Sequence, residues 1–502
     1  MKALRRIISA VIIATVVSCA TVTASADENV GKIGDDAKQY LASTVSYDSR
    51  VNAVLANAWD SYATSVSVID YKIKSSDFAD VYINVSDLYP EYFYLDIANT
   101  TYYINSAGYV TKIDIAYLYS SVTCNKQRAQ LETAVSNVLS KMRGIKGEED
   151  KIVFLHDYIT AHNAYDFNGV LGDVNAVDDY SFTAYGCLVN NISVCQGMSD
   201  AFLLLCKRLG ISAAMATSDD MVHVWNFVKT GDSFYHLDIT WDDDCSDSGL
   251  SFDGYSFLDL KGFAAHNYFM KSDLQMLSLE HYSWEQTHYA KDELTYRDYY
   301  WNDVYSQIFF IKGYQYYIKD SKLIKRNPTT KEEKVLYTID NSTFSVGENQ
   351  YAWYSRSSVL AYNYKDNFLI INLADGAYAY NLNSGELTKV FEFNEDGYIG
   401  GMILDDMTML YDVVSVKDNK FYQTSDNSAQ ITFPSYSADY GDVDAEEGFG
   451  ISDILYMKKF FLDSKVDINE FSADVNEDNS VDAKDLLMMI KKQAGYSVNF
   501  GG

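Results

Sequence analysis

Residues Ser193–Asp200 read SVCQGMSD, and this stretch predicts the start of a helix. This helix and the two segments after it carry the residues that say most about function. Cys195 follows polar residues and opens a run of apolar residues at helical spacing, which stops at Gly210. The apolar positions of this run are Met198, Ala201, Phe202, Leu205 and Leu209. A thiol at a helix N-terminus lies at the positive end of the helix dipole, which favours the thiolate.

Two strand-like runs follow the helix, at Val222–Val228 and Phe234–Trp241. The segment Lys229–Ser233 between them is typical of a hairpin turn. His223 lies on the first run and Asp238 on the second. The hairpin therefore brings an imidazole and a carboxylate towards each other.

The register of the hairpin decides whether these two side chains meet. If residues 230–231 form the loop, His223 lies directly opposite Asp238. If residues 231–232 form it, Asp238 is the diagonal neighbour on the same face. In both registers the two positions lie roughly 5 to 8 Å apart. A three-residue loop would instead place them on opposite faces.

Cys195, His223 and Asp238 together supply a nucleophile, a base and a group that orients the base. These are the parts needed for acyl transfer through a thioester. The backbone N–H of Cys195 and one further donor would meet the oxyanion, and Gln196 and Tyr185 are candidates for that donor. Taken singly, each residue has a plain structural interpretation, such as a small buried thiol or a core histidine. The shared face of the hairpin favours the catalytic interpretation.

The combined motifs resemble the bacterial transglutaminase-like superfamily. The segments that carry the resemblance are Ser181–Val189, Val194–Ser199, His223–Asn226 and Asp238–Asp242, preceded by the predicted helix Lys151–Asn163 with His156-Asp157 and then by Tyr165-Asp166. The resemblance implies a papain-like fold with Cys195 as nucleophile, His223 as base and Asp238 as orienting acid. Met198 and Val224 depart from the family pattern without touching these three residues. The superfamily includes proteases, transamidases, deamidases and inactive members, so resemblance leaves the reaction open.

The C-terminal part carries a duplicated acidic pattern. Residues 442–453 and 474–485 align without gaps, and each runs into an apolar helical pattern. Oxygen ligands at alternate loop positions suit Ca²⁺. The expected ligands are Asp442, Asp444, Glu446, the Gly448 carbonyl and Asp453 in the first loop, and Asp474, Asn476, Asp478, the Ser480 carbonyl, Asp482 through water and Asp485 in the second. The plain alternative is an acidic helical hairpin that binds no ion.

This repeat resembles a dockerin, the EF-hand-like module that attaches enzymes to cellulosomes. The resemblance implies two Ca²⁺ sites and a cohesin module of a scaffoldin as partner. Recognition of the cohesin would fall on Ile451, Ser452, Ala483 and Lys484. The sixth loop position is usually Gly but is Glu447 in the first loop and Asn479 in the second. Asn tolerates left-handed backbone better than Glu does, so the second loop fits the pattern better.

The N-terminus and the charge balance favour secretion. Residues 1–26 combine a basic start, an apolar run and Ala24-Ser25-Ala26, as in a signal peptide cleaved before Asp27. Residues 16–19 also form a loose lipobox, which keeps a lipoprotein as the minor alternative. No other stretch is expected to span a membrane. A formal net charge of −30, or −33 once three basic leader residues are removed, argues against non-specific binding of nucleic acid.

Five cysteines remain after this cleavage, so at least one thiol is unpaired if all pairing is internal. A free Cys195 fits that count. Pairing of Cys195 with Cys206 is excluded if the helix forms, because the two lie about three turns apart. Pairing of Cys187 with Cys195 stays open.

The remaining sequence predicts a multidomain protein. Helices are expected near 36–41 and 50–62, and strands at 69–73, 81–85 and within 102–118. Short Tyr- and Phe-rich runs between 308 and 393 predict a β meander. The expected division is 1–26 signal peptide, 27–145 N-terminal α+β region, 146–297 α+β papain-like catalytic domain, 298–433 Tyr-rich β domain, 434–441 linker and 442–498 small all-α dockerin.

The sequence thus predicts a secreted, cellulosome-attached cysteine enzyme acting on a protein or peptide substrate. Amide hydrolysis without a catalytic cofactor is the favoured reaction, because the exterior is rich in water. Protein cross-linking by transamidation and a non-catalytic binding subunit are the alternatives.

Overall fold

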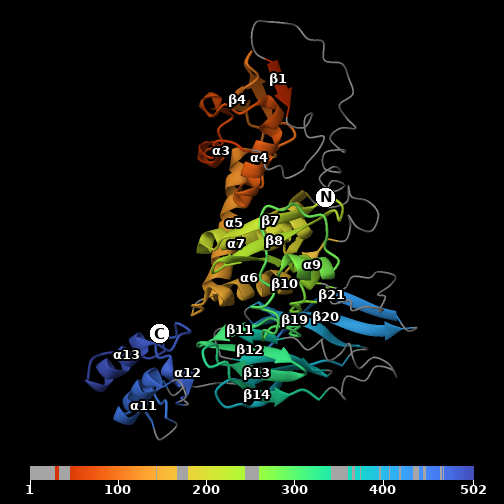
Figure 1. Ribbon diagram of the computed structural model, residues 1–502. Coiled ribbons are helices and arrows are strands. Elements are labelled where there is room, and N and C mark those ends of the chain that lie inside the picture. The colour runs from red at the N-terminus through yellow and green to blue at the C-terminus, as the bar shows by residue number, and fades with distance from the viewer. Residues whose placement is uncertain are drawn as a thin grey trace. The chain divides into compact units, whose positions relative to one another are not determined.

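The computed structural model (Figure 1) describes most of the chain. The described residues are 29–32, 46–142, 144–166, 179–243, 259–340, 360–363, 368–373, 375–394, 397–405, 407–417, 420–433, 440–444, 448–463, 466 and 468–501. They form two compact units, each assembled from three segments of the chain. The first unit comprises Met1–Asn137, Asn163–Trp241 and Tyr268–Tyr299, and the second comprises Val138–His162, Asp242–Asn267 and Tyr300–Gly502.

The N-terminal part of the first unit is an antiparallel sheet covered by two helices. Its strand order is β1-β3-β4-β2, and its elements are β1 (Asn29–Lys32), α3 (Arg50–Asp60), β2 (Ser65–Ser67), α4 (Phe78–Asp87), β3 (Thr101–Ile104) and β4 (Val110–Asp114). Trp59, Phe78 and Tyr82 lie at the centre of an aromatic core between helices and sheet. Short 3-10 turns occur at Ile69–Tyr71, Ser75–Asp77 and Pro90–Tyr92.

Two sequence predictions in this part are wrong. The run 81–85 was expected to be a strand but lies inside α4, and residues 69–71 form a 3-10 turn. The apolar residues Phe78, Val81, Tyr82 and Val85 are three and four positions apart and are all buried. This helical period outweighs the β-branched composition of the short run. The helix expected near 36–41 lies outside the described residues.

The rest of the first unit is built around the helix that begins at Cys195. A second antiparallel sheet has the order β10-β9-β8-β7, and helix α7 packs on β7 and β8. The elements are the parallel pair β5 (Ala164–Tyr165) and β6 (Ile192–Ser193), a 3-10 turn (Asp179–Phe182), a π-helical turn (Gly186–Asn190), α7 (Cys195–Leu209), β7 (Ala213–Ser218), β8 (His223–Thr230), β9 (Ser233–Leu237), α8 (Ile239–Asp242), β10 (Phe269–Lys271) and α9 (Asp273–Ser278). The long helix α5 (Ser121–Lys141) ends in residues of the second unit.

The second unit contains three antiparallel meanders, in which strands consecutive in sequence are neighbours in the sheet. They are β11 (Phe309–Ile311), β12 (Tyr314–Lys319), β13 (Lys322–Arg326) and β14 (Glu333–Thr338); β15 (Leu360–Asn363), β16 (Phe368–Leu373), β17 (Gly376–Asn381) and β18 (Leu387–Glu392); and β19 (Tyr398–Asp405), β20 (Thr408–Lys417) and β21 (Lys420–Gln430). Alternating aromatic and aliphatic residues bury two cores among these sheets. The predicted β meander is confirmed. Helix α6 (Glu148–His162) belongs to this unit and covers the predicted helix Lys151–Asn163 almost entirely.

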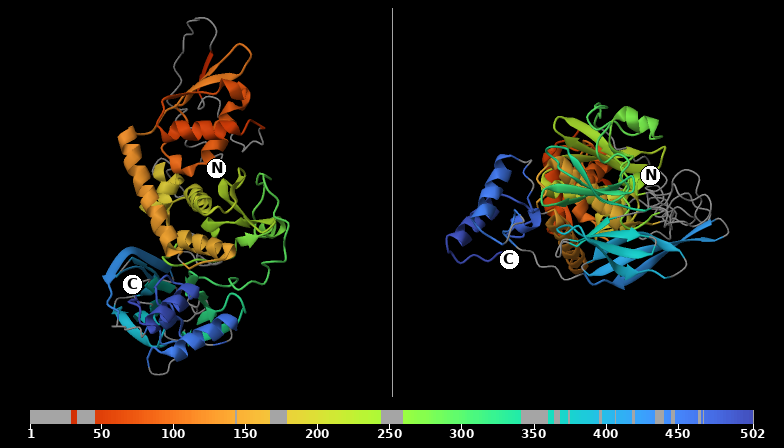
Figure 2. Two further views of the ribbon diagram at one scale, coloured as in Figure 1. Left: turned by 90° about the vertical axis from the view of Figure 1, so that its left-hand side faces the viewer. Right: turned by 90° about the horizontal axis from the view of Figure 1, so that it is seen from below.

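The C-terminal segment is helical among its described residues. It contains α11 (Ile451–Leu462), α12 (Glu470–Ala473) and α13 (Ala483–Gln493), drawn in blue in Figures 1 and 2. Helices α11 and α13 pack together over a small core of their own, with Met457 and Met489 fully buried. Each long helix follows one of the two acidic loops.

Candidate functional site

Cys195 is the first residue of α7, as its sequence context predicts. The helix ends at Gly210, which adopts left-handed backbone with φ 71°. Gly197 allows close packing of the first turn, because a Cβ there would lie 2.6 Å from the carbonyl oxygen of Ser181. The Cys195 side chain is buried, with 2 % relative exposure. The thiol is thus held at a helix N-terminus and shielded from solvent.

The hairpin has the second of the two predicted registers. Strand β8 pairs with β9 so that Thr230 faces Ser233, which makes Gly231 and Asp232 the loop. Asp238 follows the last residue of β9 and is the diagonal neighbour of His223 on the same face. The prediction that the two side chains meet is confirmed, since His223 Nε2 lies 2.6 Å from Asp238 Oδ2.

The three expected catalytic side chains, Cys195, His223 and Asp238, are linked in sequence by hydrogen bonds. The Cys195 side chain hydrogen-bonds to the His223 ring. Burial alone would lower the pKa of His223, but the Asp238 carboxylate and the Cys195 side chain outweigh burial and raise it to about 10. Burial opposes ionisation of Asp238, yet His223 and then His281 hold its pKa well below its usual range. An ionised Asp238 beside a protonated His223 is the state that this geometry favours.

A second imidazole contacts the same carboxylate. His281 is fully buried, and its Nε2 lies 2.8 Å from Asp238 Oδ2. Its Nδ1 lies 3.2 Å from the carbonyl oxygen of Leu279. The other carboxylate oxygen, Oδ1, accepts the backbone N–H of Trp241 at 3.2 Å. Asp238 is therefore fixed by three donors, and His281 is a site residue that no motif in the sequence indicated.

Tyr165 lies beside the nucleophile. The parallel pairing of β5 with β6 carries it there, because Ser193 of β6 lies two residues before Cys195. Its hydroxyl accepts the backbone N–H of Cys195. Burial, followed by the nearby Cys195 and Asp238, raises the pKa of Tyr165, so the phenol keeps its proton.

The two expected oxyanion donors make other contacts. Gln196 Nε2 donates to Asp200 Oδ1 at 3.1 Å, one helical turn away. The Tyr185 hydroxyl donates to Gln130 Oε1 at 3.0 Å, and its ring stacks on Phe93. These contacts favour Tyr165 over both residues as the neighbour of the Cys195 backbone N–H.

No disulfide that would block the Cys195 thiol forms among the described cysteines. None of the described cysteines, Cys124, Cys187, Cys195 and Cys206, is in a disulfide. The pairing of Cys187 with Cys195, which the sequence left open, is therefore not formed. Cys245 lies outside the described residues.

The second unit contains a buried cluster of imidazoles and carboxylates that includes His156 and Asp157 of the predicted motif. Asp157 Oδ1 accepts His156 Nδ1 at 2.8 Å and His266 Nε2 at 3.0 Å. Asp157 Oδ2 accepts the backbone N–H of Ile308 at 2.7 Å. His156 Nε2 also lies 3.2 Å from Asp242 Oδ2. Burial opposes protonation of His156, but contact with Asp157 and Asp242 outweighs burial and raises the pKa of His156 to about 9.

This cluster joins distant parts of the chain within the unit. Asp157 and His266 are 109 positions apart, and Ile308 directly precedes β11. The side chains of His156, Asp157, Asp242 and His266 are all essentially inaccessible to solvent. A buried network of this kind stabilises the unit, and its removal leaves uncompensated charge.

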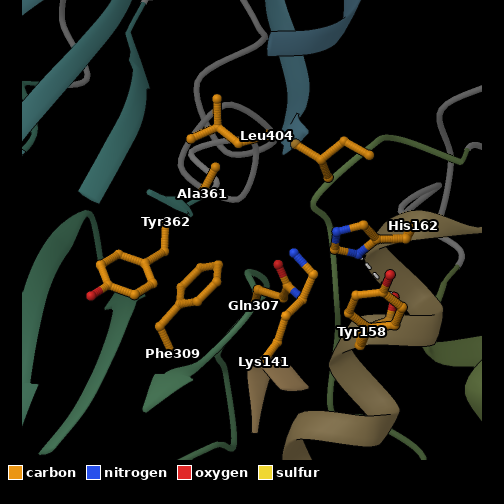
Figure 3. Close-up of a pocket in the computed structure, with 9 residues that line it drawn as sticks. Lys141, Tyr158, His162, Gln307, Phe309, Ala361, Tyr362 and Leu404 are labelled. Carbon is orange, nitrogen blue, oxygen red and sulfur yellow. Dashed lines mark hydrogen bonds between the residues drawn. The ribbon is translucent and has the colours of Figure 1, made fainter. Parts of the chain in front are cut away.

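A small pocket of the second unit contains none of the expected site residues. Figure 3 shows His162, Lys141 and Gln307 facing one hollow, with Phe309 and Tyr362 on its other side. His162 Nδ1 donates to the Tyr158 carbonyl oxygen at 3.0 Å. Burial and the neighbouring Lys141 lower the pKa of His162 to about 4, so its ring is neutral at pH 7.

The first acidic loop gathers three of its five expected ligands. Oxygen atoms of Asp442, Asp444 and Asp453 lie within 4.8 Å of one another. The two oxygens of Asp453 also accept the backbone N–H groups of Val443 and Gly450. Gly448 adopts left-handed backbone with φ 76°. Glu446 lies outside the described residues.

The second acidic loop is closed by its own backbone. Asp474 accepts the N–H groups of Asp478 and Asn479. Asp485 accepts those of Asn476 and Asp482. Burial raises the pKa of Asp485 to about 6, and the nearby charges of Asp474 and Asp478 add to this. Carboxylates that converge in this way fit a hard divalent cation, whose charge would relieve their repulsion.

The four expected recognition residues occupy matching positions. Ile451 and Ser452 begin α11, and Ala483 and Lys484 begin α13. All four are exposed, Ile451 by 61 %. An exposed Ile at a helix start is available for contact with another protein.

Comparison with known proteins identifies one part of the chain. No curated protein matches this chain. A solved structure titled "Crystal structure of a TGase" is 13 % identical over 34 % of this chain and 50 % of its own, with a TM-score of 0.21, which is too low to establish a shared fold. Residues 440–492 match the family model for the Dockerin type I domain. The C-terminal segment of this chain is therefore a type I dockerin domain.

Proposed function

We propose that this chain is a secreted, transglutaminase-like cysteine enzyme that transfers acyl groups from amide bonds and is attached to a cellulosome through its dockerin. The observation that carries the enzymatic part is the line from Cys195, at the N-terminus of α7, through His223 to Asp238 Oδ2. A nucleophile, a base and an orienting carboxylate in hydrogen-bond contact are the arrangement that thioester chemistry requires. The proposed core is papain-like, with 146–297 as its catalytic region.

The proposed reaction begins with attack of the Cys195 thiolate on an amide carbonyl carbon. The Tyr165 hydroxyl, whose oxygen accepts the Cys195 backbone N–H, donates its own hydrogen to the oxyanion. His223 gives its proton to the departing amine, and a thioester to Cys195 remains. Water then attacks the thioester as His223 accepts its proton. The tetrahedral intermediate breaks its C–S bond, which releases the carboxylic acid and restores the Cys195 thiolate beside a protonated His223. Asp238 keeps the His223 ring in position throughout.

Acyl-donor screening of the mature protein against Cys195→Ser tests this proposal. Hydrolysis predicts that the wild type releases cleaved or deamidated peptide and that Cys195→Ser does not. Incorporation of an added primary amine without such release would favour transamidation instead. If no donor forms a thioester with Cys195 in intact-mass measurements, the chain is a non-catalytic binding subunit.

Replacement of Tyr165 tests the oxyanion assignment. We expect Tyr165→Phe to lower acyl transfer by about a hundredfold, the usual effect of losing one oxyanion donor. Alkylation of Cys195 by iodoacetamide forms no oxyanion, so its rate should stay within about twofold. Tyr185→Phe is the matched control and should leave both rates unchanged. Equal effects of the two substitutions would refute the assignment.

Replacement of His281 tests its role as a positioning residue. His281→Phe keeps an aromatic ring but cannot donate to Asp238, so we expect it to slow acyl transfer about tenfold. Because a proton donor beside Asp238 is removed, the pH dependence of Cys195 alkylation should move to higher pH. A purely structural role would lower the amount of folded protein and leave that pH dependence unchanged.

The dockerin domain supports a cohesin module as the partner of this chain and an extracellular location. Type I dockerin domains bind calcium and cohesin modules. Calcium would be held here by Asp442, Asp444, Glu446, Gly448 and Asp453, and by Asp474, Asn476, Asp478, Ser480, Asp482 and Asp485, where it would cross-link each loop. No helix among the described residues is long and apolar enough to cross a membrane. The proposed location is extracellular, on a scaffoldin.

Calcium removal tests the attachment. Excess chelator should abolish capture of the mature protein by immobilised cohesins from a panel, and added calcium should restore it. Asp485→Ala should lower the calcium stoichiometry from about two to one, because the last ligand position closes the loop. Unchanged capture in chelator would contradict calcium-dependent attachment.

A further inference from the structure

The second acidic loop makes contacts that calcium binding does not explain. Asn479, at its sixth position, bridges the turn between β11 and β12 of the same unit. Its Nδ2 donates to the Phe310 carbonyl oxygen at 3.1 Å, and its Oδ1 accepts the Lys312 backbone N–H at 3.2 Å. One side-chain amide thus satisfies a donor and an acceptor of the turn. No ligand role falls on Asn479.

Charge pairs reinforce this contact. Lys312 Nζ lies 2.6 Å from Asp474 Oδ2, with side-chain exposures of 5 % and 0 %. Lys325 Nζ lies 2.7 Å from Glu470 Oε1, and both side chains are largely buried. Ion pairs with this little solvent around them persist only where geometry is good. Both join the dockerin to strands or turns of the first meander.

The contact is also closely packed. Phe471 of α12 has 2 % exposure and belongs to the apolar core of the β meanders, together with Phe309 and Tyr316. Gly144, with φ 88°, abuts the Asn479 carbonyl oxygen, and a Cβ there would lie only 2.4 Å from it. A loosely tethered module would not insert a ring into another core or require glycine at its boundary.

These contacts give a reason for the departure of Asn479 from the glycine usual at that position. Its φ of 62° is left-handed, a conformation in which glycine carries less strain than asparagine. Glycine at position 479 would only ease the left-handed backbone of the loop, whereas asparagine also makes two hydrogen bonds to the β11–β12 turn. Ile451, Ser452, Ala483 and Lys484 remain exposed in the same arrangement.

We infer that the second calcium loop and α12 form a docking surface for the β11–β12 turn, so that the dockerin is held on the Tyr-rich β domain with its recognition residues exposed to solvent. The surface is defined by Asn479, Asp474, Glu470 and Phe471 on the dockerin and by Phe310, Lys312 and Lys325 on the β domain. The inference is independent of the catalytic proposal.

Hydrogen exchange of the full mature chain in calcium tests the inference. Asn479→Gly keeps the loop backbone favourable and removes only the amide contacts. We expect the Lys312 amide to exchange at least about tenfold faster in this variant, while the calcium stoichiometry stays unchanged. Equal exchange in wild type and variant would overturn the inference.

A charge swap gives an independent test if Asn479→Gly folds poorly. Lys325→Glu places a second carboxylate beside Glu470 and should speed exchange in the β11–β12 turn. Adding Glu470→Lys should restore slow exchange, because the pair is rebuilt with its charges reversed. A double variant that exchanges as fast as the single variant would overturn the inference.

Discussion

Asp238→Asn is expected to lower the rate of acyl transfer by about 10⁴-fold, the effect of the same substitution in a serine protease triad. The carboxylate accepts His223 Nε2 at 2.6 Å and His281 Nε2 at 2.8 Å on one oxygen. An amide of the same shape cannot accept both donors with equal strength, and its NH₂ group would favour the wrong His223 tautomer. Single-turnover kinetics with an activated acyl donor would measure the loss.

The matched control for this substitution is Asp200→Asn. Asp200 also accepts a side-chain N–H, from Gln196, but it lies one turn along α7 from the N-terminus that carries Cys195. We expect its acyl-transfer rate to stay within a few-fold of the wild type. A similar rate for Asp238→Asn would contradict the role of Asp238 as the orienting acid.

Asp157→Asn is expected to reduce the free energy of unfolding by about 3 kcal/mol or more, because it breaks a buried charge network. Asp157 accepts His156, His266 and the backbone of Ile308, all without solvent access. Urea unfolding would measure the change. Glu386→Gln, at an exposed position, is the control and should change stability by less than about 0.5 kcal/mol. A loss below about 1 kcal/mol for Asp157→Asn would contradict the network's role.

The same network gives stability a pH dependence with a defined sign. The pKa of His156 is raised to about 9 in the folded chain, above its unfolded value of about 6.5. Its stabilising contribution is therefore complete below about pH 6.5 and is lost as pH rises through about 9. In Asp157→Asn this alkaline loss should be smaller, because one of the two carboxylates that raise the pKa of His156 has gone.

Local sequence patterns predicted the parts of the site that depend on local structure. The helix from Cys195 to Leu209 followed from apolar spacing and a terminal glycine, and two-residue turn chemistry limited the hairpin to registers that join His223 and Asp238. The two acidic loops followed from their repeat. In each case the deciding contacts lie within about fifteen residues of one another.

Residues brought in from far along the chain could not be predicted this way. His281 contacts Asp238 across 43 positions, from a segment with no motif of its own. Tyr165 reaches Cys195 through a parallel strand pair of two residues, too short to leave a pattern. Sequence alone also could not show that Gln196 hydrogen-bonds to Asp200 and Tyr185 to Gln130.

Alkylation of Cys195 by iodoacetamide tests the central claim most directly. The calcium-loaded mature protein would be treated at several pH values, and each cysteine followed by peptide mass spectrometry in wild type and His223→Ala. The catalytic account predicts that Cys195 alone reacts rapidly near pH 6 and that its rate falls when His223 is removed. Cys124, Cys187 and Cys206 are buried as Cys195 is, but they are not at the N-terminus of α7 beside His223, so they should stay unmodified. If Cys195 is as inert as these three, or reacts equally fast without His223, the proposed thiolate–imidazolium pair does not exist.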